Sequence, residues 1–181
     1  MVTRQDIESA FLEGLLKGPK VVSRFMKTKT DVWNKTVTAA LVKAGKRVVP
    51  DACVAAEDHK DGFGRSGYFD VDVTVYENKS WGQVLMMAEH EAGHSRLDVQ
   101  IAAWKLLNIW PERRVLVAYY KEGSAVGSFD ILHELVCEVA NRHRGKEILL
   151  IGADRGATPG TPEELRAAYQ STSIRLLPAI R

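Results

Sequence analysis

Two spacings of apolar residues recur along the chain, and each predicts its own kind of element. Apolar residues every three or four positions predict amphipathic helices. The clearest case covers residues 3–17, where Thr3 is a suitable N-cap and Ile7, Phe11 and Leu15 share one stripe. The same spacing predicts a second helix through Val22 and Phe25, a third over residues 31–44 that ends at Gly45, one from about Ser95, one over residues 128–143 and a short one from Thr161 through Tyr169.

Alternation of apolar and polar residues predicts a strand over residues 68–76. One side of this strand carries Phe69, Val71, Val73 and Val75, and the other carries Asp70, Asp72, Thr74 and Tyr76. Further strands are expected over residues 46–56, the apolar run 84–88, residues 113–120, residues 146–152 and, as an edge strand, residues 173–181. The polar, glycine-rich residues 57–67 predict a loop. Helices and strands in this order predict an α/β domain.

Residues 88–94, AEHEAGH, permit two interpretations with different chemistry. In a strand, Glu89 and Glu91 share one face, because side chains alternate with a period of two. In a helix, His90 and His94 lie on one face with Glu91 beside them, which is the H-E-x-x-H arrangement of zinc peptidases. The residues that follow Glu91 include an Ala-Gly pair and make a poor helix interior. The strand is therefore the favoured interpretation.

A new helix is expected to open near Ser95, with Leu97, Ile101 and Trp104 on its packed face. After Pro111, the run RRVLVAYY predicts a buried strand. The central stretch of the chain is thus expected to fold as a β-hairpin, a helix and a further strand.

This order of elements resembles the core of the PD-(D/E)xK nucleases, the restriction-endonuclease-like superfamily. The resemblance rests on a strand with an aspartate, a turn, a strand that ends in Glu-x-Glu, a helix that contains Lys-Leu-Leu and a further apolar strand. Most members carry lysine at the third motif position, where this chain has Glu91, as in the E-x-E variant of some type II restriction endonucleases. The resemblance covers residues 45–152 and implies a three-layer α/β fold in which helices flank a mixed central sheet.

The resemblance further implies a Mg²⁺-dependent endodeoxyribonuclease. Asp72 and Glu89 would be metal ligands, with Asp70 as the rival of Asp72, and Glu91 would be a further ligand or the general base. Carboxylate oxygens suit Mg²⁺ or Mn²⁺, and neighbouring strands about 4.8 Å apart would bring these acids together. Lys105 lies on the following helix, from which some relatives supply their catalytic lysine. The plainer interpretation is a solvated acidic sheet face and an exposed helix lysine.

Two other functions stay open. A zinc metallopeptidase would use His90, Glu91 and His94, although no third ligand with a clear spacing stands out. A non-catalytic member of the nuclease fold would bind nucleic acid or a protein partner, and the missing motif lysine motivates this alternative. No P-loop spacing occurs in the glycine-rich loop.

Charge is distributed unevenly, although the formal net charge is only +2. Residues 1–47 hold ten Lys or Arg against four Asp or Glu, a balance of +6, so the remainder carries −4. This asymmetry suits an N-terminal region that contacts DNA phosphates. The candidate nucleic-acid-binding residues are Lys17, Lys20, Arg24, Lys60 and Arg65.

Length and composition predict a single domain, because 181 residues that are 45% hydrophobic and 27% charged can build one core. We divide it into N-terminal helices (1–45), a catalytic core (46–152) and a C-terminal helix with an edge strand (153–181). The longest apolar runs are shorter than the roughly 20 residues that span a bilayer, and the N-terminus lacks a signal-like apolar segment, so a cytoplasmic protein without membrane contact is expected. A homodimer is expected by analogy with restriction-like nucleases alone.

Overall fold

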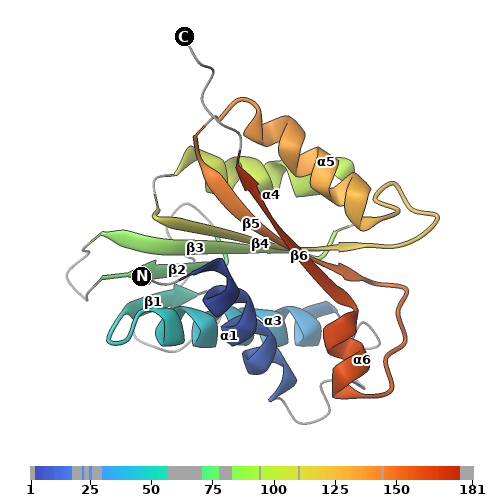
Figure 1. Cartoon of the computed structure of the whole chain (residues 1–181), viewed down its shortest axis with the longest axis horizontal. Coiled ribbons are helices and arrows are strands. Elements are labelled where there is room, and N and C mark those ends of the chain that lie inside the picture. Colours follow the sequence, from blue (N-terminus) through green and yellow to red (C-terminus); the bar gives the residue numbers. More distant parts are fainter. Residues whose placement is uncertain are drawn as a thin grey trace.

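A six-stranded mixed sheet forms the centre of the molecule (Figure 1). The computed structural model describes residues 3–17, 22, 25, 30–56, 71–77, 83–93, 95–109, 111–143 and 145–175. The strands are β1 (Cys53–Ala56), β2 (Val73–Tyr76), β3 (Val84–Glu91), β4 (Arg113–Tyr120), β5 (Glu147–Asp154) and β6 (Tyr169–Arg175). They lie side by side in chain order, with β3, β4 and β5 parallel and the other neighbours antiparallel. The predicted α/β class with a mixed sheet is confirmed.

Helices cover both faces of this sheet, which gives three layers (Figure 1). The helices are α1 (Arg4–Leu16), α3 (Thr30–Val48), α4 (Arg96–Asn108), α5 (Phe129–Ala140) and α6 (Pro162–Ala167). On one face, α1 and α3 pack over Val75, Met86 and Val117. On the other face, α4 and α5 pack over Met87 and Leu116. Alternate residues of each central strand therefore enter two separate cores.

The connections between the parallel strands decide where side chains can meet. Helix α4 joins β3 to β4, and α5 joins β4 to β5, so each connection crosses over one face of the sheet. The carboxyl ends of β3, β4 and β5 consequently lie at one edge. Residues at the ends of these strands are brought together there, although they are far apart in the sequence.

The expected strand over residues 46–56 is wrong in its first half. Helix α3 continues through Gly45 to Val48, and only Cys53–Ala56 is extended. Gly45 is buried against β2, where an added Cβ would lie 2.6 Å from Val75 Cγ2. The glycine therefore permits a close approach of helix and sheet and does not end the helix.

Helix α4 forms where it was expected but packs on a different face. Its buried residues are Val99, Ala102, Ala103, Leu106 and Leu107. Leu97, Ile101 and Trp104, the predicted packed stripe, are 62%, 45% and 55% exposed. Both sets repeat at helical spacing, so periodicity could not separate them. The small alanines allow the helix to lie close to the sheet, and this packing decides the orientation.

Two strand boundaries also differ from expectation. Strand β2 begins at Val73 after a bend at Asp72, and Val71 packs with the α4 and α5 core, whereas Val73 enters the opposite core. The expected alternation therefore breaks at the bend. Near the C-terminus, β6 already starts at Tyr169, because it pairs antiparallel with β5 along its whole length. The expected edge strand at 173–181 therefore starts four residues later than the observed strand. Residues 176–181, the predicted loop 57–67 and most of the predicted second helix lie outside the described residues.

Within the described part of the chain, no helix combines the length and apolar character that crossing a membrane requires.

Candidate carboxylate site

The Glu-x-Glu segment lies at the end of a strand and not in a helix. Strand β3 runs through Glu91, with Glu89 opposite Leu116 and Glu91 opposite Ala118 in the parallel pairing with β4. The predicted strand interpretation of AEHEAGH is thus confirmed through Glu91. Glu89 and Glu91 share the face that α4 covers, and His90 lies on the opposite face. The site is therefore built at the carboxyl end of β3.

Asp72 lies directly beside this strand end. The bend at Asp72 interrupts the β2–β3 ladder after the pair Val73 and Ala88. In place of a backbone carbonyl, the Asp72 carboxylate accepts a hydrogen bond from the His90 N–H, with Oδ2 2.6 Å from the nitrogen. This bond fixes Asp72 next to Glu89, as the predicted metal-ligand pair requires.

Glu89 is the buried acid of the group. Its side chain is only 8% exposed, and its Oε1 lies 3.3 Å from Lys105 Nζ on α4. Burial, and next the negative charge of Asp72, raise the pKa of Glu89 from 4.5 to about 8, although Lys105 opposes the shift. The structure therefore brings Asp72, Glu89 and Lys105 together.

Glu91 continues the group towards the start of α4. Its Oε1 accepts a 2.5 Å hydrogen bond from the Gly93 N–H. A Cβ added at Gly93 would lie 2.6 Å from Glu91 Oε1 and 2.8 Å from Asp98 Oδ2, so two carboxylates converge on this glycine. Asp98 stands in the first turn of α4, where its N–H bonds to the N-cap Ser95. The nuclease interpretation had not included Asp98, although the N-cap pattern at Ser95 could have placed it near the strand end.

His90 connects the strand to the core behind the site. Its Nε2 lies 3.0 Å from the Tyr119 hydroxyl oxygen, and the two rings meet edge to face with centroids 5.4 Å apart. The Trp33 indole N–H of α3 donates to the same hydroxyl at 2.8 Å. Desolvation lowers the pKa of His90 from 6.5 to about 3, so its imidazole is neutral at neutral pH. Sequence reasoning had assigned His90 only to the zinc alternative.

A second contact holds the segment beyond the strand. Arg155, which follows β5, donates from Nη1 to the Ala92 carbonyl at 3.0 Å, and its own N–H bonds to the Tyr120 carbonyl. Arg155 therefore joins these strand ends: its guanidinium holds the segment after β3, and its backbone N–H holds the end of β4. No sequence motif marks Arg155, because its position follows only from the order of the strands.

The donor set fits a hard cation. Among the described residues, no three His, Cys, Asp or Glu side chains form a ready-made metal cage. Mg²⁺, however, is usually bound by one or two carboxylates together with waters and substrate phosphates. Asp72 and Glu89, whose Oε1 lies 3.3 Å from Lys105 Nζ, supply such a pair of oxygen ligands. Burial is the main cause of the raised pKa of Glu89, and a cation here would offset the second cause, the negative charge of Asp72.

Several predicted residues do not enter this description. Lys17 is exposed at the end of α1, where its backbone N–H caps the helix. Its predicted contact with DNA remains untested. The other predicted residues lie outside the described residues and comprise Asp70, His94, Lys60, Arg65, Lys20 and Arg24.

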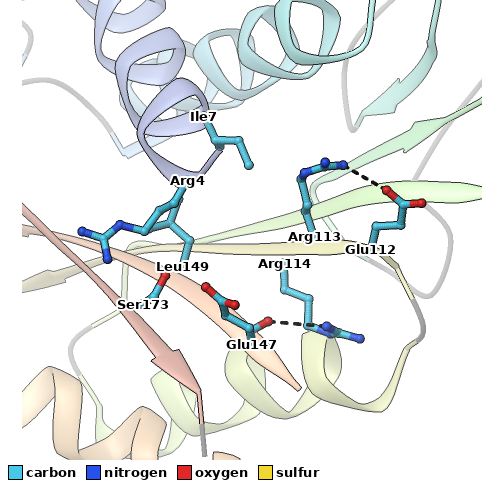
Figure 2. A pocket seen from close by; sticks show the side chains of 8 residues that line it. All are labelled: Arg4, Ile7, Glu112, Arg113, Arg114, Glu147, Leu149 and Ser173. Carbon is cyan, nitrogen blue, oxygen red and sulfur yellow. Dashed lines mark hydrogen bonds and ion pairs between the residues drawn. The ribbon is translucent and has the colours of Figure 1, made fainter. Parts of the chain in front are cut away.

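A separate hollow of about 330 Å³ lies at the other end of the parallel strands (Figure 2). Its lining includes Arg113 and Glu147, which begin β4 and β5. Arg113 pairs with Glu112 at 3.1 Å, and the buried Arg114 donates to backbone carbonyls. Since strands rise about 3.3 Å per residue, this hollow lies well over 10 Å along the sheet from Glu91. Arg113 is engaged with Glu112 and Arg114 with the backbone, so this hollow is a weaker candidate for a site.

Comparisons with protein-family models, with curated proteins and with solved structures find no match to this chain.

Proposed function

We propose that the chain is a metal-dependent nuclease that hydrolyses phosphodiester bonds in DNA. One observation carries the proposal: the buried Glu89 carboxyl group lies beside Asp72, in the bend before β2, and 3.3 Å from Lys105 of the covering helix. Cleavage of a phosphodiester needs oxygen ligands for a cation and a positive charge near the phosphate. This group of side chains offers both.

The arrangement of elements supports a restriction-endonuclease-like fold within this proposal. Asp72 stands at the start of β2, Glu-x-Glu ends β3, α4 follows with Lys105, and β4 comes next. This is the order on which the resemblance to the PD-(D/E)xK nucleases rests. The proposal is supported by the bend before β2, where Asp72 bonds to the His90 N–H and so lies beside the first glutamate, as a shared metal site would require.

Each side chain has a distinct role in the proposed reaction. Asp72 and Glu89 would hold Mg²⁺ or Mn²⁺, which when bound neutralises charge on the phosphate and lowers the pKa of a water. Glu91, on the same face, would bind the cation further or accept the proton of the attacking water. Lys105 lies 3.3 Å from Glu89 Oε1 and would contact the phosphate from the helix side.

The structure gives the zinc-peptidase alternative less support. His90 and Glu91 lie in β3, and α4 begins only at Arg96, so these two residues do not share a helix with the spacing that H-E-x-x-H needs. The His90 Nε2 atom also faces Tyr119 within the core. A non-catalytic DNA-binding role remains an alternative, because Glu91 replaces the usual motif lysine.

Plasmid cleavage by metal-stripped protein tests the proposal. Supercoiled DNA is incubated with the protein and with Mg²⁺, Mn²⁺ or Zn²⁺, and Glu89→Gln is compared with Glu138→Gln, a matched change at an exposed glutamate of α5. We expect nicking or linearisation with Mg²⁺ or Mn²⁺ that Glu89→Gln abolishes and that Glu138→Gln and His94→Ala retain. DNA binding without cleavage under any metal would favour the non-catalytic alternative. Activity that requires Zn²⁺ and His94 would favour the peptidase.

A further inference from the structure

His90, the middle residue of the Glu-x-Glu segment, contacts the carboxylate site through its backbone, although its side chain lies on the opposite face of the sheet. The His90 backbone N–H holds the Asp72 carboxylate at 2.6 Å. Its chain neighbours on both sides are Glu89 and Glu91. The positions of all three acids are therefore tied to the position of one residue, whose side chain points to the opposite face of the sheet.

That side chain is anchored in the opposite core. Its Nε2 atom is 3.0 Å from the Tyr119 hydroxyl, and Trp33 donates to this hydroxyl from α3. Tyr119 is 1% exposed, and its ring is packed into the core of α1 and α3. Because two hydrogen bonds and close packing fix the Tyr119 hydroxyl, it is a rigid point to which the end of β3 can be attached.

A strand end without such an anchor would be free to shift. The ladder between β2 and β3 stops at Val73 and Ala88, and β3 pairs only with β4 beyond that point. Arg155 holds the Ala92 carbonyl, and on the side of β2 the described residues hold the end of β3 through the Asp72 carboxylate. The His90 ring thus adds a side-chain anchor, on the opposite face of the sheet, to the pairing of β3 with β4 that holds Glu89 and Glu91.

We propose that His90 and Tyr119 form a positioning pair, which holds Asp72, Glu89 and Glu91 in the geometry that binds a divalent cation. This inference rests on the proposed metal-dependent function. His90 acts through the strand and does not touch the cation, because its ring lies on the far face of the sheet. The intervening residue of Glu-x-Glu is therefore a determinant of metal affinity in this chain.

Direct measurement of Mn²⁺ affinity tests the pair without any need for cleavage. Tyr119→Phe removes the hydroxyl that meets His90 and that also accepts the Trp33 indole N–H. Its matched control is Tyr120→Phe, the same change at the next residue, whose hydroxyl accepts a bond from Gln170 and faces the other core. Mn²⁺ binding is measured by calorimetry, and the electron paramagnetic resonance spectrum of bound Mn²⁺ reports the ligand geometry.

We expect Tyr119→Phe to weaken Mn²⁺ binding about tenfold, as changes in residues that support metal ligands commonly do, and to broaden the spectrum. Tyr120→Phe should bind as the wild type does. A second pair gives an independent answer if Tyr119→Phe does not fold: His90→Leu should weaken binding, whereas His90→Gln, which keeps a hydrogen-bonding atom, should restore most of the affinity. Rescue by glutamine would not follow from a purely apolar packing role.

Two outcomes separate the inference from the function on which it rests. Wild-type affinity in both Tyr119→Phe and His90→Leu, together with loss of binding in Glu89→Gln, would overturn the positioning role and leave the metal site standing. Equal Mn²⁺ binding by the wild type and Glu89→Gln would overturn the metal site itself, and the positioning role with it.

Discussion

Replacement of Glu89 by glutamine should stabilise the metal-free protein, and the gain should grow as the pH rises from 5 to 8. Burial, followed by the charge of Asp72, raises the pKa of this carboxyl from 4.5 to about 8. Between these values the unfolded chain has lost the Glu89 proton while the folded chain keeps it. The wild type is therefore favoured by this group below pH 4.5 and loses that contribution as the pH approaches 8. Glutamine resembles the protonated acid and does not titrate.

The magnitude follows from the size of this shift. Each pH unit in the interval changes the free energy of unfolding by about 1.4 kcal/mol, so the whole interval corresponds to at most about 5 kcal/mol. Lys105 is 30% exposed and can move with the titration, and water reaches the site from that side. We expect these effects to reduce the contribution to about 2–4 kcal/mol.

Urea unfolding of the metal-free protein between pH 5 and pH 8 measures this effect. The difference in free energy of unfolding between Glu89→Gln and the wild type should widen by about 2–4 kcal/mol across the range. Glu138→Gln, at an exposed position of α5, should follow the wild type at every pH. Parallel curves for Glu89→Gln and the wild type would refute the reasoning, because Glu89 would then titrate as an ordinary solvated acid.

Two further predictions concern the scaffold. In a urea titration, Gly45→Ala should lower the free energy of unfolding by about 1–3 kcal/mol, because the added Cβ would lie 2.6 Å from Val75 Cγ2. Its control is Gly127→Ala, where the added Cβ would make ordinary contacts and the free energy of unfolding should hardly change. Arg114→Met should cost about 3 kcal/mol, because three backbone carbonyls lose their charged donor, and the exposed Arg142→Met serves as its control. A cost for Arg142→Met equal to that for Arg114→Met would contradict this account.

Local sequence signals were enough for the elements that depend on them. Strand β4 occupies the predicted residues 113–120, because an uninterrupted apolar run after Pro111 has no competing interpretation. Helix α6 begins after Thr161, whose side chain caps it as the Thr-Pro-Glu-Glu sequence indicates. The Glu-x-Glu strand was also predicted, since the weak helix propensity after Glu91 favoured the strand over the helical alternative.

Features set by contacts between distant segments could not be predicted in this way. The exposed face of α4 could not be inferred, because Trp104 and its partners repeat at the same spacing as the buried alanines. Gly45 was predicted to end the helix, because its close packing against Val75 of β2 has no signal in the local sequence. Arg155 reaches the Ala92 carbonyl because the order of the strands brings the end of β5 near the end of β3. The His90 contact with Tyr119 likewise depends on the pairing of β3 with β4.

The most direct measurement is the initial rate of plasmid cleavage at increasing Mg²⁺, determined for the wild type and for Glu89→Gln under conditions where both are folded. The account predicts a rate that rises from zero and saturates with Mg²⁺ in the wild type, and no cleavage in Glu89→Gln at any concentration. Equal rates in the two proteins, or a wild type that leaves the plasmid intact throughout, would contradict the proposed nuclease.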